Sequence, residues 1–69
     1  MYELANGHKL ELLEKYDERL NTTHYAIAEY NELGSFVGIA FSDWDCSKCE
    51  SWAERAMDRG FGYAPTIGG

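Results

Sequence analysis

The chain has 69 residues, twelve of them Asp or Glu and six Lys or Arg, which gives a formal net charge of −6 at pH 7. The acidic residues are spread from Glu3 to Asp58, so the negative field covers most of the surface, repels nucleic acid and favours basic partners. A hydrophobic content of 45% argues against disorder. We expect one domain, residues 1–69, that buries only about 60% of its unfolded surface.

We expect no membrane attachment. The N-terminal segment MYELANGHKLELLEK lacks a basic stretch followed by an apolar run. The longest apolar or glycine run, residues 36–41, is too short to cross a bilayer. The expected location is the cytoplasm, where both cysteines would be reduced.

Residues 8–20 are compatible with two structures. The segment LELLEKYDERL has high helix propensity and would place three apolar side chains on one side of a helix, namely Leu13, Tyr16 and Leu20. Asn6-Gly7, by contrast, is a strong signal for a β-hairpin that joins YELA to HKLEL. A helix over residues 8–20 is the preferred interpretation, and a strand is the alternative.

Residues 23–42 predict a β-hairpin. In THYAIAEYN, Tyr25, Ile27 and Glu29 alternate with the residues between them, and SFVGIAF alternates in the same way. The intervening NELG contains a glycine and few apolar groups, so it should form a short turn between two antiparallel strands.

A helix is predicted over residues 45–59. Three side chains could accept the free N–H groups of its first turn, those of Ser42, Asp43 and Asp45. Gly60 should end it. An apolar stripe should pack against the hairpin and contains Cys49, Trp52, Ala53, Ala56 and Met57. The predicted fold class is therefore α+β, a small antiparallel sheet packed against a C-terminal helix.

The last residues, FGYAPTIGG, are expected to be irregular or extended, because Pro65 is incompatible with a helix interior. Phe61 and Tyr63 could fold back onto the core. Gly68-Gly69 is similar to the end of ubiquitin-like sulfur carriers, in which a terminal Gly-Gly is activated as a carboxylate.

The CxxC motif in DWDCSKCESW suggests an alternative function. A thiolate at a helix N-terminus is stabilised by the helix dipole, and Lys48 would add to that effect. The segment resembles the thioredoxin and glutaredoxin family in five pieces: the strand at 36–41, Trp44, Cys46, Cys49 and the run Ala64-Pro65-Thr66-Ile67. That resemblance implies thiol redox activity. However, fifteen residues between Cys49 and Pro65 leave no room for the strand and helix that the family has there.

We expect no metal and no cofactor. A structural zinc site needs four ligands, and one CxxC supplies two. The candidate ligands are Cys46, Cys49 and His24, with His8 as a further possibility, but their order matches no common zinc pattern.

Carboxylates recur at helical spacing in two places. The first row, in the predicted C-terminal helix, consists of Glu50, Glu54 and Asp58. The second row, which requires a helix over residues 8–20, consists of Glu11, Glu14 and Glu18, with Asp17 beside it. Carboxylates one helical turn apart lie roughly 6 Å from one another along the axis. Such rows could occupy a basic groove built for DNA or RNA, so we assign these seven residues to a partner-binding face.

Size, acidity and layout together make the chain similar to the small inhibitors that phages encode against host nucleic-acid machinery, anti-CRISPR proteins in particular. The resemblance implies a non-enzymatic inhibitor that acts in the host bacterial cytoplasm. It also implies a partner, a CRISPR effector or surveillance complex whose basic channel the inhibitor occupies. Two alternatives remain, inhibition of another host nucleic-acid enzyme and a redox or metal-binding role for Cys46 and Cys49.

Overall fold

The computed structural model describes residues 1–62 of the chain. The predictions made for Tyr63, Pro65 and Gly68-Gly69 concern residues outside this range. The elements, in chain order, are β1 (Tyr2–Glu3), β2 (Lys9–Asp17), β3 (Thr22–Tyr30), β4 (Phe36–Asp43) and α1 (Cys46–Arg59).

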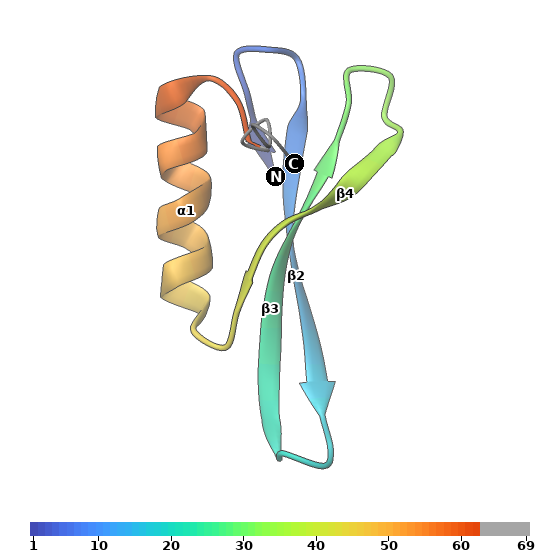
Figure 1. The fold of residues 1–69 in the computed structure, drawn as a ribbon, viewed down its shortest axis with the longest axis vertical. Helices are drawn as coiled ribbons and strands as arrows, with labels where there is room; N and C mark the ends of the chain where they lie inside the picture. Colours follow the sequence, from blue (N-terminus) through green and yellow to red (C-terminus); the bar gives the residue numbers. More distant parts are fainter. Residues whose placement is uncertain (63–69) are drawn as a thin grey trace, which may run out of the picture.

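The four strands form one antiparallel sheet in the order β1-β2-β3-β4, and α1 packs against one of its faces (Figure 1). The other face, called the open face below, carries no helix among the described residues. The lower end of the β2–β3 hairpin projects beyond the helix (Figure 1). This arrangement confirms the predicted α+β class. No helix within residues 1–62 combines the length and apolar character needed to cross a membrane.

The preferred interpretation of residues 8–20 as a helix is wrong, because residues 9–17 form strand β2. The Asn6-Gly7 signal determines the local structure: Gly7 has φ 89°, and the Leu4 N–H donates to the His8 carbonyl over 2.9 Å. Strand β2 then pairs with β3 without a break, from Lys9 opposite Tyr30 to Asp17 opposite Thr22. Continuous pairing and burial of Leu10 outweigh the local helix propensity.

The predicted hairpin over residues 23–42 is confirmed as β3 and β4. Asn31 organises the turn, since its Oδ1 accepts the N–H groups of Leu33 and Ser35, each over 2.9 Å. The β3–β4 register shifts between Ile27 and Ala28 and again beyond Glu29. Such irregularities bend an edge strand and increase its twist.

The predicted C-terminal helix is also confirmed. Of the three candidate caps, Asp45 is the one used, because its side chain accepts the Ser47 N–H over 2.9 Å. Gly60 ends the helix in the left-handed region, with φ 89°, and donates its N–H to the Ala56 carbonyl. The left-handed conformation suits glycine, which has no Cβ to clash.

One face of α1 is buried through Cys49, Ala53 and Ala56, as predicted. These residues complete a core cluster with three residues of the sheet and its first turn, Leu4, Leu10 and Ile27. Trp52 is half-buried, and its ring stacks on Phe41 with centroids 5.6 Å apart. Met57 does not belong to the buried stripe, because 38% of it is exposed. Phe61 is likewise outside the core cluster, and its ring lies 5.3 Å from the Arg59 guanidinium.

Candidate functional site

The exposed side of α1 carries the first row of carboxylates. Glu50, Glu54 and Asp58 are all exposed and follow one another at four-residue spacing along α1, outside the buried set of Cys49, Ala53 and Ala56. Because residues 46–59 form the helix that was predicted, these three carboxylates form the expected row. Successive members are separated by roughly 6 Å of helix rise.

Strand β2 contributes one further carboxylate to this side of the molecule. Glu14 alternates with Glu11 and Leu13, so it points to the same face of the sheet as Leu10 and Leu12, which is the face that α1 covers. Burial raises the pKa of the Cys46 thiol, and the carboxylates of Glu50 and Glu14 raise it further. Glu14 therefore lies close enough to the start of α1 to act on the same thiol as Glu50.

Strand β1 lies near two of the α1 carboxylates, Glu50 and Glu54. Burial raises the pKa of the Tyr2 hydroxyl, and the negative charges of Glu50 and Glu54 raise it further. We use the name acidic face for the four carboxylates on this side of the molecule, Glu14, Glu50, Glu54 and Asp58.

The predicted second row of carboxylates does not exist, because residues 9–17 form a strand in which neighbours point to opposite faces. Glu11 lies on the open face, where it accepts a hydrogen bond from the Tyr30 hydroxyl over 3.0 Å. That hydrogen bond is the main cause of the raised pKa of Tyr30. Glu11 and Glu14 therefore cannot contact one flat partner surface together.

Asp17 and Glu18 lie at the far end of the β2–β3 hairpin. Asp17 Oδ1 accepts the backbone N–H groups of Arg19 and Leu20, over 3.0 and 3.3 Å, and so holds the turn. Of the seven residues predicted to bind a partner, the structure thus places four on the acidic face and separates Glu11, Asp17 and Glu18 from it.

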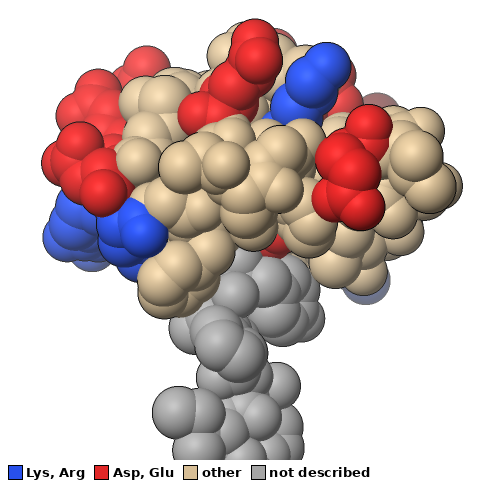
Figure 2. Space-filling model, turned by 90° about the horizontal axis from the view of Figure 1, so that it is seen from above, with Lys and Arg blue, Asp and Glu red and all other residues tan. Residues whose placement is uncertain are grey.

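Acidic side chains are also present elsewhere on the molecule. Figure 2 looks down on the end that carries the β1–β2 and β3–β4 turns and shows Asp and Glu at several separate points around its rim. The negative charge is therefore distributed, and the acidic face differs from the rest of the surface by the regular spacing of its three carboxylates on α1.

Both cysteines are free thiols, Cys46 half-buried and Cys49 buried. Burial raises the pKa of Cys49, and the negative charge of Asp43 raises it further. The pKa of Cys46 is raised as described above. A nucleophilic CxxC thiol requires a lowered pKa, so the acidic surroundings of this motif oppose redox chemistry.

His24 belongs to β3, whereas both cysteines belong to α1. Its ring packs against that of Trp44, with centroids 4.5 Å apart, on the open face of the sheet. Within residues 1–62, no group of three or more His, Cys, Asp or Glu side chains is placed to hold a metal ion.

A buried carboxylate beside a histidine was missed in the sequence. Glu29 is 2% exposed, and its Oε2 lies 2.7 Å from Nδ1 of His8. The other ring nitrogen of His8, Nε2, lies 3.3 Å from Oε2 of the exposed Glu32. The alternation in β3 contained the signal, since it placed Glu29 on the same face as Ile27, but nothing in it pointed to His8.

Scans of this chain against protein-family models, curated proteins and solved structures find no match.

Proposed function

We propose that this protein is a non-enzymatic binding protein that docks its acidic face onto a basic surface of a partner protein. The observation that carries the proposal is the row of exposed carboxylates on α1, extended by Glu14 on β2. No Lys or Arg within residues 1–62 forms an ion pair with any of the four. Their charges are therefore available to an external partner.

The partner that fits this face best is a groove that otherwise holds a nucleic-acid backbone. Carboxylates at one-turn intervals along a straight helix offer negative charge at a spacing comparable to that of backbone phosphates. Like-charge neighbours at this spacing cost a few tenths of a kcal/mol each in the free protein. A basic groove would relieve that repulsion on binding.

We assign the protein to the anti-CRISPR type of phage-encoded inhibitor, with a CRISPR effector or surveillance complex as its target. Small size, a net charge of −6 and a single helix presenting the carboxylates support this assignment. Inhibition of a different host nucleic-acid enzyme would use the same face and the same chemistry.

The test is a charge reversal on the acidic face. Glu50→Lys/Glu54→Lys should abolish protection of a plasmid from CRISPR interference in a bacterium with an active system, while the fold is retained. The matched control is Glu3→Lys/Glu18→Lys, which changes the net charge equally at exposed positions away from the acidic face. Full protection by the folded acidic-face variant would contradict the proposal, as would absence of protection by the parent protein.

A further inference from the structure

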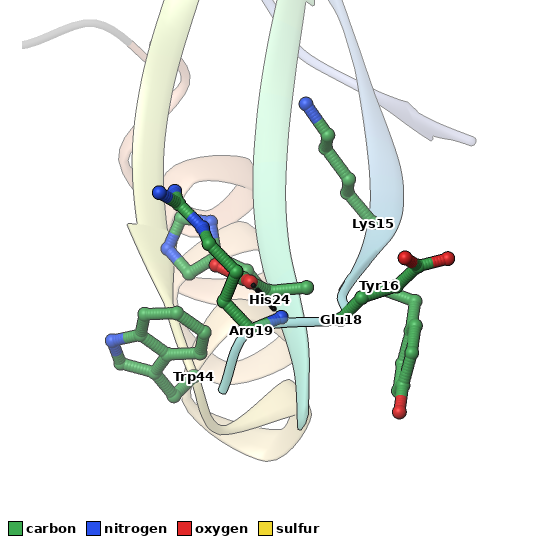
Figure 3. A pocket seen from close by; sticks show the side chains of 7 residues that line it. Lys15, Tyr16, Glu18, Arg19, His24 and Trp44 are labelled. Atoms are coloured by element: carbon green, nitrogen blue, oxygen red, sulfur yellow. Dashed lines mark hydrogen bonds between the residues drawn. The ribbon is translucent and has the colours of Figure 1, made fainter. Parts of the chain in front are cut away.

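Three basic residues lie on the open face at the far end of the β2–β3 hairpin. Lys15 and His24 stand directly opposite each other in the β2–β3 register, and Arg19 comes from the turn that joins these strands. Seen from the open face, with α1 behind the sheet, the Arg19 side chain extends toward His24 (Figure 3).

Trp44 stands beside this basic cluster. It lies between β4 and α1, and 50% of it is exposed. Its indole packs against the His24 ring at an interplanar angle of 53°. Part of the indole surface therefore remains open to a ligand.

These residues surround a hollow of about 490 Å³, lined by Lys15, Tyr16, Asp17, Glu18, Arg19, His24 and Trp44. Small-molecule sites commonly measure roughly 300–1,000 Å³. The hollow is thus large enough for a ligand of about the size of a nucleotide.

Neither carboxylate of the hollow forms an ion pair with Lys15 or Arg19 within residues 1–62. Asp17 Oδ1 is occupied by the backbone N–H groups of the turn. Glu18 and Arg19 point to opposite sides of the hairpin in Figure 3. A bound anion can therefore accept hydrogen bonds from Lys15 and Arg19 without displacing an existing ion pair.

We propose that this hollow binds a small anion that carries a flat ring. The anionic group accepts hydrogen bonds from the Lys15 ammonium and the Arg19 guanidinium, and the ring stacks on the exposed surface of Trp44. The anionic group is a phosphate, as in a nucleoside monophosphate, or a carboxylate, as in an aromatic acid.

The site is separate from the acidic face, since it lies on the face of the sheet opposite α1. Its ligand carries one anionic group, whereas a nucleic-acid strand would bring many phosphates into the negative field of the whole molecule. The proposal therefore stands whether or not the acidic face binds a partner.

Titration followed by NMR tests the proposal. Adenosine monophosphate and phenylacetate represent the two sources of the anion, and the probe is the Trp44 indole N–H signal, identified by its loss in Trp44→Leu. We expect at least one ligand to shift this signal. Lys15→Gln and Arg19→Gln should each weaken binding about tenfold. Lys48→Gln, which removes the same charge from α1, should have no effect.

Further ligands and variants test the two parts of the site separately, namely the cations that bind the anion and the Trp44 surface that stacks on the ring. Adenosine lacks the anion and inorganic phosphate lacks the ring, so each should bind more weakly than adenosine monophosphate. In Trp44→Leu the indole signal is absent, so binding is followed through the backbone N–H signal of Arg19. This variant should bind the ring-bearing ligands more weakly but keep its weak phosphate binding unchanged. The proposal is overturned if neither ligand shifts the Trp44 signal, or if Lys48→Gln weakens binding as much as Arg19→Gln does.

Discussion

Nδ1 of His8 lies 2.7 Å from Oε2 of Glu29, and this contact joins the turn after β1 to the last part of β3, on its core-facing side. A carboxylate that is 2% exposed requires such a partner, because an unpaired buried charge is strongly destabilising.

The first prediction concerns this pair. Glu29→Gln should lower the free energy of unfolding by about 1–3 kcal/mol, because a charge-assisted hydrogen bond inside the protein is replaced by a neutral one. Urea denaturation measures the change. Glu32→Gln is the control, since it touches the same imidazole from an exposed position and should cost at most about 1 kcal/mol. Equal losses in the two variants would show that burial of Glu29 is not the cause.

The second prediction concerns Gly62, which lies against the same carboxylate. A Cβ at this position would stand 2.8 Å from Oε1 of Glu29 and 3.1 Å from Cδ2 of Leu10. Gly62→Ala should therefore destabilise the fold by about 1–3 kcal/mol through crowding of the core. The comparison variant is Gly34→Ala. A Cβ at that position meets no atom within 4 Å, so the loss of stability there comes only from the positive φ of 84°. Wild-type stability of Gly62→Ala would contradict the described packing.

The third prediction is a dependence of stability on pH. The hydrogen bonds that Asp45 accepts from Ser47 lower the pKa of its carboxyl. The folded state therefore favours the ionised form, and the associated stability is present above the usual aspartate pKa and lost as the pH falls below it. Asp45→Asn keeps a capping side chain but cannot titrate. Thermal unfolding between neutral and acidic pH should show a smaller acid loss in Asp45→Asn than in the parent, and identical losses would refute this role.

The fourth prediction tests the placement of Glu14. Because the carboxylates of Glu50 and Glu14 raise the pKa of the Cys46 thiol, either Glu→Gln change should speed alkylation of Cys46 by iodoacetamide at mildly alkaline pH. Glu18→Gln, located in the hairpin turn, should leave the rate unchanged. Mass spectrometry distinguishes Cys46 from Cys49. A helix over residues 8–20 would place Glu14 and Glu18 on one side, and equal effects of the two variants would favour that helix.

The fifth prediction separates the structural role of the cysteines from function. Cys49→Ser places a hydroxyl in the core and should lower stability by about 1–2 kcal/mol, whereas the half-buried Cys46→Ser should have the smaller effect. Both variants should keep the inhibitory activity of the parent in the plasmid-protection assay. Loss of activity in a folded Cys46→Ser protein would point to thiol chemistry instead of docking through the acidic face.

The hairpin over 23–42 and the helix over 45–59 could be predicted because each has a single strong periodicity and clear turn or cap residues. Residues 8–20 carry two periodicities, since Leu10 and Leu12 suit a strand and Leu13 and Tyr16 suit a helix. Pairing with β3 decides between them, and that pairing is a tertiary interaction.

The candidate site likewise has a part that local sequence patterns predict and a part that depends on tertiary contacts. The α1 part of the acidic face depends only on four-residue spacing within one helix, so it could be derived from the sequence. The inclusion of Glu14 depends on the direction of β2, and the contact of His8 with Glu29 joins residues 21 positions apart. Contacts of this kind are set by strand register, which one-dimensional patterns do not determine.

The order of the sheet has a consequence for how the chain folds. Every strand pairs with its neighbour in sequence, and the two longer hairpins are closed by short segments, residues 18–21 and 31–35. Short loops carry a low closure entropy, so each hairpin can form without waiting for distant parts of the chain. Pairing between strands that are adjacent in sequence keeps contacts more local than pairing between distant strands would, and local contacts favour faster folding. We therefore expect the β2–β3 and β3–β4 hairpins to form early, with α1 docking onto a sheet that has already acquired its register.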